Sequence, residues 1–328
     1  MSILPINLMR YLIFLKVNAP MVWFRFFPSM EFSLVLGTLI SESLPSVQAR
    51  PWKKSLEPWK KHGGITSIKK NPPKRPPNAP WPVESVIFSY PGKRAYGEGE
   101  LILMELKLFG EAADHGFFLE VILPAIEKAS HTIDWSWQKS NSLWGKFDIE
   151  YIYAARGRNW DVLVDQKTLN LKYMATPRQW CENLFVENEF PDKFQRLKWI
   201  TPFDLQAGKG QTTKFHKKIP QEHIPSLKDI LLAFLTRLEE LPTAQHNRFW
   251  DTMNGETKDL FDNAVEAAST VQMTDGYFKV VQESQYGTWI GRQDFETIPE
   301  PILPYLSLAS LFHVGAYTHY GCGTFLIE

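Results

Sequence analysis

Apolar residues follow two different spacings along the chain, and these spacings predict a mixture of strands and helices. Runs or alternations of apolar residues predict strands at 10–17, 83–90, 99–110, 144–154, 194–205, 276–284 and 287–290. Apolar residues at helical spacing predict helices at 30–40, 117–128, 226–241 and 302–312. Strands and helices interleaved in this way predict an α+β protein.

Two of the predicted helices carry start signals. Ser29 is a candidate N-cap for the first helix. Ser226, followed three residues later by the acid Asp229, forms a loose capping-box pattern at the start of the helix at 226–241. A strand, an apolar turn and a Ser-capped helix, as in 10–40, is how a ferredoxin-like or RNA-recognition-type domain begins.

Residues 50–82, here called the basic segment, differ from the rest of the chain. They include nine Lys and Arg residues against a single acid, Glu57. Eight prolines are spread through the segment with Trp residues between them, which predicts extended backbone rather than regular helix. One interpretation is a surface that attracts RNA phosphates and stacks on bases. The other is a solvated linker between two domains, and the two interpretations are compatible.

The end of the chain is a glycine-punctuated stretch between an apolar helix and a short apolar strand. Gly315, Gly321 and Gly323 permit backbone angles that other residues resist. Such a loop can press its N–H groups close to a phosphate or to another backbone, and its Tyr317 and His319 can stack on or hydrogen-bond to a base. The alternative interpretation is a tight turn with no ligand.

Four motifs, in order, carry a resemblance to a known family. They are a Gly-Glu that opens the strand at 99–110, a Thr-Pro in the strand at 194–205, a helix that carries Arg237, and the terminal loop. The loop, with His-Val-Gly, a short Thr-containing gap, Gly-x-Gly and then an aromatic residue, resembles that of the RAMP superfamily of CRISPR-associated RNA-binding proteins. Within that superfamily the chain resembles the endoribonuclease that cuts CRISPR repeat transcripts into guide RNAs.

The resemblance covers most of 83–328 and, more loosely, the first forty residues. It implies an α+β fold of tandem ferredoxin-like (RNA-recognition-type) domains with antiparallel sheets. We expect an N-terminal ferredoxin-like domain at 1–82, which includes the basic segment. We expect a C-terminal RAMP domain at 83–328, which ends in the glycine-rich loop.

The family cuts RNA without a metal, so the resemblance implies no cofactor. The 2′-hydroxyl attacks the adjacent phosphate and leaves a 5′-hydroxyl and a cyclic phosphate. This chemistry needs a general base, an acid and a cation near the phosphate, and His serves well because its pKa is near neutral. Many relatives place a His in or just after the first helix, whereas the first His of this chain is His62. His62 is the candidate catalytic residue; the alternative is a solvated loop histidine.

The expected partner is the hairpin of CRISPR repeat RNA, together with other subunits of a CRISPR effector complex. The candidate RNA-binding residues come from the basic segment, the helix of the second half and the terminal loop. They are Lys53, Lys54, Lys60, Lys61, Lys69, Lys70, Arg237, Gly315, Tyr317, His319, Gly321 and Gly323.

Other histidines have two interpretations each. His313 precedes the loop and is expected to be half-buried, where it hydrogen-bonds in the core or orients the loop. His216 lies in a basic run, where it contacts phosphate or is simply solvated. His319 contacts RNA or is an exposed loop residue.

The amino-acid composition further limits the class of protein. The 328 residues suffice for two domains, and a 44% hydrophobic share with 14% aromatic residues indicates well-packed globular structure. Lys and Arg number 36, as do Asp and Glu, so any basic surface must be local. Cys181 and Cys322 match neither a metal-ligand spacing nor a disulfide framework, which favours reduced thiols in a cytoplasmic protein. The apolar stretches near the start are too short and interrupted to span a membrane.

Three hypotheses remain open. The leading one is an enzyme that grips a repeat hairpin, cuts below it without metal and stays bound to the 3′ end of the guide. The second is a non-catalytic RAMP subunit that holds guide RNA in an effector complex, which the absence of an early His favours. The third is an unrelated α+β interaction protein in which the glycine-rich loop is only a turn.

Overall fold

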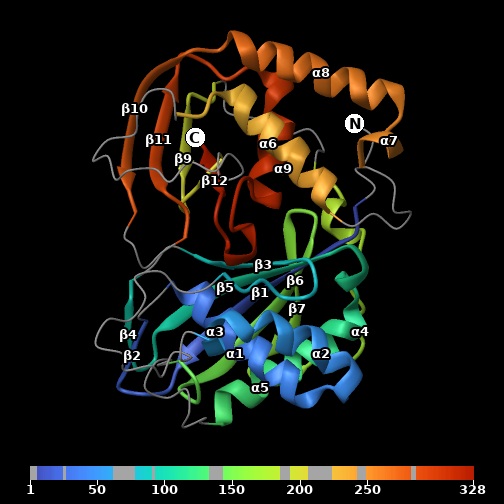
Figure 1. Cartoon of the computed structure of the whole chain (residues 1–328), viewed down its shortest axis with the longest axis vertical. Coiled ribbons are helices and arrows are strands. Elements are labelled where there is room, and N and C mark those ends of the chain that lie inside the picture. The colour runs from blue at the N-terminus through green and yellow to red at the C-terminus, as the bar shows by residue number, and fades with distance from the viewer. Residues whose placement is uncertain are drawn as a thin grey trace. The chain divides into compact units, whose positions relative to one another are not determined.

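The computed structural model describes residues 6–24, 27–61, 78–90, 93–132, 143–184, 193–205, 224–241, 249–281 and 286–328. The chain forms two compact units (Figure 1). The N-terminal unit is built from Ile6–Leu184, and the C-terminal unit from Phe185–Gln282 and Tyr286–Glu328.

The N-terminal unit contains one large sheet. Its strands are β1 (Leu8–Val17), β3 (Ser85–Ser89), β5 (Leu101–Phe109), β6 (Phe147–Arg156), β7 (Asn159–Asp165) and β8 (Thr168–Leu169). They lie in the order β3-β5-β1-β6-β7-β8, and every neighbouring pair is antiparallel. A separate ribbon pairs β2 (Met21–Trp23) with β4 (Ala95–Gly97).

Helices join the strands of this unit. They are α1 (Pro28–Ser43), α2 (Ser46–Ser55), α3 (Glu57–Lys61), α4 (His115–Phe117) and α5 (Leu123–His131), with a π-helical turn at Phe118–Ile122 before α5. Along the chain, the main elements follow the order β1-α1-β3-β5-α5-β6, which is strand, helix, strand, strand, helix, strand. Because the first strand lies between the third and the fourth, the topology is ferredoxin-like.

The C-terminal unit repeats this plan. Its strands are β9 (Arg196–Trp199), β10 (Met273–Val280), β11 (Trp289–Phe295) and β12 (Phe325–Ile327), in the order β10-β11-β9-β12 and all antiparallel. Its helices are α6 (Leu227–Glu240), α7 (Phe249–Thr252), α8 (Gly255–Thr270) and α9 (Leu303–Phe312). The order β9-α6-β10-β11-α9-β12 is again ferredoxin-like, with α7 and α8 added after α6. The expected tandem of ferredoxin-like domains is therefore confirmed.

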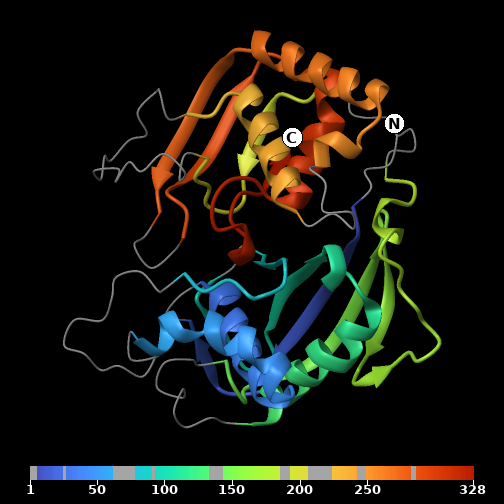
Figure 2. The same cartoon turned by 45° about the vertical axis from the view of Figure 1, so that its right-hand side comes forward.

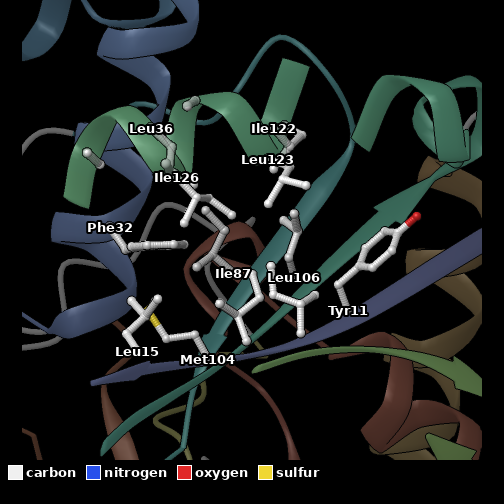
Figure 3. Packing of buried hydrophobic residues seen from close by; sticks show 14 of the residues in the cluster. Tyr11, Leu15, Phe32, Leu36, Ile87, Met104, Leu106, Ile122, Leu123 and Ile126 are labelled. Atoms are coloured by element: carbon white, nitrogen blue, oxygen red, sulfur yellow. The ribbon is translucent and has the colours of Figure 1, made fainter. Parts of the chain in front are cut away.

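Alternation along the strands builds the core of the N-terminal unit. Tyr11, Ile13 and Leu15 of β1 are fully buried, whereas Leu12 and Phe14 between them are only half-buried. Figure 3 shows the buried side of the sheet meeting α1 and the helical turns before and within α5: Leu15, Met104, Leu106 and Ile87 face Phe32, Leu36, Ile122, Leu123 and Ile126. The helices therefore cover one face of the sheet.

The first part of the basic segment is helical, contrary to the extended backbone expected there. It forms the end of α2 and all of α3, and Pro51 lies inside α2. Trp52 and Trp59 are buried, and the Trp52 ring lies 5.2 Å from that of Trp81. These tryptophans pack in the core, which stabilises the helices more than the proline destabilises them. Residues 62–77 of the segment lie outside the described part of the chain.

The division between the units also differs from the one expected after residue 82. β3 and β5, which follow that residue, share a sheet with β1, which precedes it. The prolines near 82 mark a turn within the N-terminal unit, and the units divide between Leu184 and Phe185 instead. The cause is long-range strand pairing. One sheet that includes β1, β3 and β5 buries more apolar surface than two separate domains divided at the prolines would.

Two capping expectations had different outcomes. The capping box at α6 is confirmed, because the Ser226 Oγ accepts from the Asp229 N–H while Asp229 accepts from the Ser226 N–H. The N-cap expected at Ser29 is wrong, since α1 begins one residue earlier at Pro28 and Ser29 is buried within it. The ring of a proline at the first helical position pre-sets the backbone for the helix.

Among the described residues, no helix is both long enough and apolar enough to cross a membrane.

Candidate functional site

The loop between α9 and β12, residues 313–324 and here called the glycine-rich loop, has an unusual backbone. His313, Gly315, Tyr317, Gly321 and Gly323 all have positive φ. For the two residues with a Cβ this is costly: Tyr317 has φ 61° and ψ 28°, and His313 has φ 62° and ψ 140°, a region that side chains strongly disfavour. Strain of this kind persists where the surroundings hold the chain in place.

Close contacts with the stretch after β9 hold the loop in place. Ala316 N–H donates to the Asp204 carbonyl at 2.9 Å, and Gly323 N–H donates to the Pro202 carbonyl at 2.9 Å. A Cβ at Gly315 would lie 2.5 Å from the Asp204 carbonyl oxygen. A Cβ at Gly323 would lie 1.9 Å from the carbonyl oxygen of Val314. Only glycine fits at these two positions, so both glycines serve the packing of the loop itself.

His313 joins the two ends of the loop. Its side chain is fully buried, and its Nδ1–H donates to the Cys322 carbonyl at 3.1 Å. The expectation that His313 hydrogen-bonds within the core is confirmed, although the residue is fully buried rather than half-buried.

Arg237 lies beneath the loop rather than on the surface. It is 5% exposed, and its Nε–H points at the carbonyl of Phe312, the last residue of α9, at 3.5 Å. A cation at a helix C-terminus is favourable because the carbonyl ends of the helix carry partial negative charge. In this arrangement the buried Arg237 supports the loop from α6.

Four aromatic rings gather at the outer part of the loop. The Tyr286 ring lies 4.4 Å from that of Tyr317 and 4.9 Å from that of Tyr320, and the second pair is stacked. The His319 ring lies 4.2 Å from that of Tyr320 and 6.5 Å from that of Tyr317. Tyr317 and His319 are half-buried, whereas Tyr286 and Tyr320 are buried beneath them. Two candidate RNA-binding residues, Tyr317 and His319, thus lie together in the loop and are both half-buried.

Two ionisable groups of the loop, His319 and Cys322, have shifted pKa values. Burial, together with the positive charge of Arg237, lowers the pKa of His319 to about 4. Burial also raises the pKa of the Cys322 thiol, helped by the negative charge of Asp204. At neutral pH His319 is therefore an uncharged imidazole and Cys322 a protonated thiol, which suits hydrogen bonding and stacking more than proton transfer.

The backbone of the loop also offers donors. Within the described residues, the N–H groups of Gly315, Tyr317 and Thr318 have no acceptor. N–H groups at positive-φ turns favour anions such as phosphate oxygens. In the described part of the chain, no three His, Cys, Asp or Glu side chains lie close enough together to hold a metal ion. The loop accordingly combines backbone N–H donors with two half-buried aromatic rings.

The lysines of the basic segment belong to the N-terminal unit. Lys53 and Lys54 are exposed in the last turn of α2. Lys60 and Lys61 lie in α3, and their side chains are outside the described part of the structure. His62, Lys69, Lys70 and His216 also lie outside the described residues.

A second polar cluster, which no sequence motif signals, surrounds His115 in the N-terminal unit. Its Nδ1 accepts from the Tyr11 hydroxyl at 3.1 Å, and its Nε2–H points at the Tyr173 carbonyl at 3.3 Å. Burial lowers the pKa of His115, against the opposing effects of the Tyr173 carbonyl and Asp114. Both ring nitrogens are occupied and the residue is buried, so His115 fastens the stretch after β8 to the sheet.

Sequence comparisons find nothing: no family model matches the chain, and no curated protein sequence matches it. Comparison of structures gives a different result. A partial Cas6-RT-Cas1–Cas2 complex matches with a TM-score of 0.54 and 12% identity, over 98% of this chain and 46% of that chain. A Cas6-RT-Cas1–Cas2 complex matches with the same TM-score of 0.54 and 12% identity, over 98% of this chain and 29% of that chain.

The chain has a Cas6-like fold. A Cas6 product complex also aligns over 98% of this chain and 99% of that chain, at a TM-score of 0.46 and 13% identity. The Cas6-like chain spans 46% and 29% of the length of the first two structures. The family resemblance seen in the sequence is thus confirmed for the fold. The low identity agrees with the absence of a match in the sequence comparisons.

Proposed function

We propose that this Cas6-like chain is a CRISPR-associated RNA-binding protein that grips the hairpin of repeat RNA and cuts it by attack of the 2′-hydroxyl on the adjacent phosphate. The observation that carries the proposal is the pair of ferredoxin-like units that ends in a strained, glycine-rich loop. Strained backbone at a surface loop is typical of ligand-binding sites. The similar structures contain Cas6, which supports a role in CRISPR RNA processing.

In this proposal the glycine-rich loop holds the RNA backbone. The N–H groups of Tyr317 and Thr318 donate to a phosphate, and the Tyr317 ring and neutral His319 contact a base. Arg237 acts as a positioning residue, because it is buried against the end of α9 and contributes positive potential beneath the loop. The 2′-hydroxyl mechanism requires no metal.

The general base is proposed to be His62, from the basic segment. The loop histidines are poor candidates for this role, since His313 is buried with its Nδ1–H donated to Cys322 and the pKa of His319 is about 4. A base works best when its pKa is near the working pH. Exposed Lys53 and Lys54 of α2 are proposed to attract the RNA phosphates.

The second proposed function is a non-catalytic subunit that holds guide RNA. The state of the loop histidines favours it, because neither is poised for proton transfer at neutral pH. The similar structures join Cas6 to Cas1 and Cas2, so partners of this CRISPR type are proposed for either function.

One experiment separates the two. The purified full-length protein is incubated in EDTA with labelled repeat RNA from its own host, beside RNA with a 2′-deoxy sugar at the cut site. The enzyme hypothesis predicts cleavage of the first RNA and not the second, and His62→Ala should abolish it. Tight binding without cleavage would assign the chain to the guide-holding class. Absence of binding to either RNA would contradict both functions.

The contribution of the basic segment is tested by salt dependence. Replacing Lys53 and Lys54 by Gln should weaken RNA binding, because fewer RNA phosphates would be neutralised. The plot of log affinity against log salt should flatten by roughly 0.7 to 0.9 for each phosphate that is no longer neutralised. Lys228→Gln, at an exposed position of α6, is the matched control. A slope equal to that of the control would show that these two lysines do not contact RNA.

A further inference from the structure

Among the described residues, the helices of the C-terminal unit lie on one face of its sheet (Figures 1 and 2). Leu197 and Trp199 of β9 are buried, whereas Lys198 between them is exposed. Figures 1 and 2 show α6, α8 and α9 all on one side of the sheet formed by β10, β11, β9 and β12. The residues that point away from those helices, here called the open face, therefore belong to alternate positions of each strand.

Strand register brings four of these residues into one row. Tyr277 of β10 pairs with Arg292 of β11, Arg292 with Lys198 of β9, and Lys198 with Leu326 of β12. Residues paired directly across strands have Cβ atoms about 5 Å apart on the same face. The row therefore sets an aromatic ring beside two cations and an apolar side chain, although these residues are far apart in the sequence.

The side chains of the row are exposed to solvent. Tyr277 is 63% exposed and Leu326 46%, while the side chains of Lys198 and Arg292 are 55% and 45% exposed. An exposed tyrosine ring in the middle of an edge strand is not needed for packing. Such rings on the open face of a ferredoxin-like sheet are well suited to stacking on unpaired bases.

The cations of the open face form exposed ion pairs, in which a phosphate could replace the carboxylate. Lys198 lies 3.6 Å from Glu328, and Arg292 lies 3.5 Å from Asp294. Ion pairs between exposed groups contribute little stability, so a phosphate can replace a carboxylate at small cost. Exposed Lys279, two residues beyond Tyr277 on the same face, adds a cation. The face thus offers three cations to an RNA backbone, and two of them would exchange a carboxylate for a phosphate.

The open face and the glycine-rich loop belong to the same unit. The loop leads directly into β12, where Phe325 pairs with Trp199, and Leu326 of the row is the next residue. The chain therefore connects the loop to the row through one strand.

We propose that the open face binds a single-stranded stretch of RNA that flanks the hairpin, with a base stacked on Tyr277 and phosphates at Arg292 and Lys198. This inference rests on the proposed function, because it extends the RNA path from the glycine-rich loop. It adds a site that recognises unpaired RNA by stacking and charge rather than by the shape of a hairpin.

The test compares two RNAs on the full-length protein: the repeat hairpin alone, and the hairpin with a single-stranded flank. Tyr277→Ala should weaken binding of the flanked RNA about tenfold and leave binding of the bare hairpin unchanged. The double variant Lys198→Gln with Arg292→Gln should flatten the salt slope for the flanked RNA by about 1.4. Lys228→Gln, which removes one positive charge from the exposed side of α6, should match the unmodified protein.

A position-specific measurement accompanies the affinities. Flanked RNA with 5-iodouridine in the flank, irradiated in the complex, should crosslink to the peptide that contains Tyr277, and mass spectrometry identifies the site. Equal affinities and slopes for all variants, or a crosslink elsewhere only, would overturn the proposal. A variant whose sole defect is a failure to self-associate in sedimentation would instead assign the face to contact between copies of the chain.

Failure of this site is distinguishable from failure of the proposed function. If the protein cuts the bare hairpin but the open-face variants bind flanked RNA normally, the function stands and the site falls. If no repeat RNA is cut yet flanked RNA crosslinks at Tyr277, the open face stands as an RNA site and the cleavage proposal falls. Circular dichroism melting of each variant confirms that the substitutions leave the fold intact.

Discussion

The two units share one topology but connect the second helix to the fourth strand differently. In the N-terminal unit the described end of this connection turns inward: Leu143 and Trp144 are buried, and Gly145 N–H donates to the Ala129 carbonyl at 2.7 Å. In the C-terminal unit the same connection is the glycine-rich loop, with strained His313 and Tyr317 and half-buried rings. Both connections pack closely, but within the described residues only the one in the C-terminal unit combines this packing with strained non-glycine residues and half-buried rings.

The units also treat their charges differently. In the N-terminal unit Glu105 is 3% exposed and forms a 2.7 Å ion pair with Arg10, and Lys107 lies 3.9 Å from it. In the C-terminal unit Lys198 and Arg292 are exposed in the row of the open face. Buried charges must be paired to be tolerated, whereas exposed ones can readily exchange partners.

The substitution with the largest expected effect tests whether a loop glycine is required because a Cβ would clash with the neighbouring backbone. Gly323→Ala should destabilise the protein by about 4 kcal/mol or more, because the added Cβ would meet the Val314 carbonyl and φ is 83°. Gly99→Ala is the matched control, since Gly99 has φ 80° with nothing within 4 Å of the added Cβ. The control should cost only about 1–2 kcal/mol. Urea unfolding measures the loss in free energy of unfolding for both variants. Equal losses would show that the positive φ, and not the clash of the added Cβ, accounts for the destabilisation.

A second test concerns the buried ion pair of the N-terminal unit. Glu105→Gln should cost about 3 kcal/mol, because it leaves Arg10 and Lys107 without a buried counter-charge. Glu150→Gln, which removes the partner of exposed Lys16 at 3.7 Å, should cost less than about 1 kcal/mol. Thermal unfolding at neutral pH measures the difference. Comparable losses in both variants would show that burial does not strengthen the first pair.

The same carboxylate gives a pH dependence. Burial opposes its ionisation, but Arg10 and Lys107 outweigh burial and lower the pKa of Glu105 below its usual value. A lowered folded-state pKa of an acid stabilises the fold above the ordinary pKa, and this stability is lost as pH falls through the folded value. Acid unfolding of the unmodified protein should therefore be steeper than that of Glu105→Gln. Parallel curves would contradict the assignment.

A third test compares one histidine in each unit. Burial lowers the pKa of His319 to about 4 and also lowers the pKa of His115. Because the unfolded chain binds the proton more readily, each should reduce stability as pH falls below about 6.5. Between about pH 6.5 and pH 4, His319→Gln should reduce the acid-induced loss in free energy of unfolding by about 1 kcal/mol or more. His115→Gln should reduce the corresponding loss in the N-terminal unit. Nuclear magnetic resonance titration of both imidazoles measures the two pKa values directly. An ordinary pKa for His319 would contradict the effects assigned to its burial and to the charge of Arg237.

The smallest effect concerns the ring of the loop. Tyr317→Ala should weaken RNA binding about tenfold through loss of stacking, while Tyr317→Phe keeps the ring and should retain affinity. Leu143→Ala, in the equivalent connection of the N-terminal unit, should lower stability without affecting RNA affinity once folded. Fluorescence anisotropy with repeat RNA measures the affinities. Equal binding by the alanine and phenylalanine variants would remove Tyr317 from the RNA site.

Most of the helices and strands can be predicted from local patterns in the sequence. Alternating apolar residues located β1, β5 and β6, and helical spacing with the Ser226 and Asp229 pair located α6. The glycines at 315, 321 and 323 marked the loop correctly. These features depend on neighbours within a few residues, so a local pattern is enough to predict them.

The division of the chain and the roles of individual side chains depend on the folded arrangement instead. β1 pairs with β5 across the expected boundary at 82, and Arg237 and His313 lie inside the protein. Tyr277, Arg292 and Lys198 are aligned across three strands. Strand pairing and burial depend on contacts between residues far apart in the chain, whose closure is rewarded only by the complete sheet. A local pattern indicates which face of an element is apolar, but the fold determines which partner covers that face.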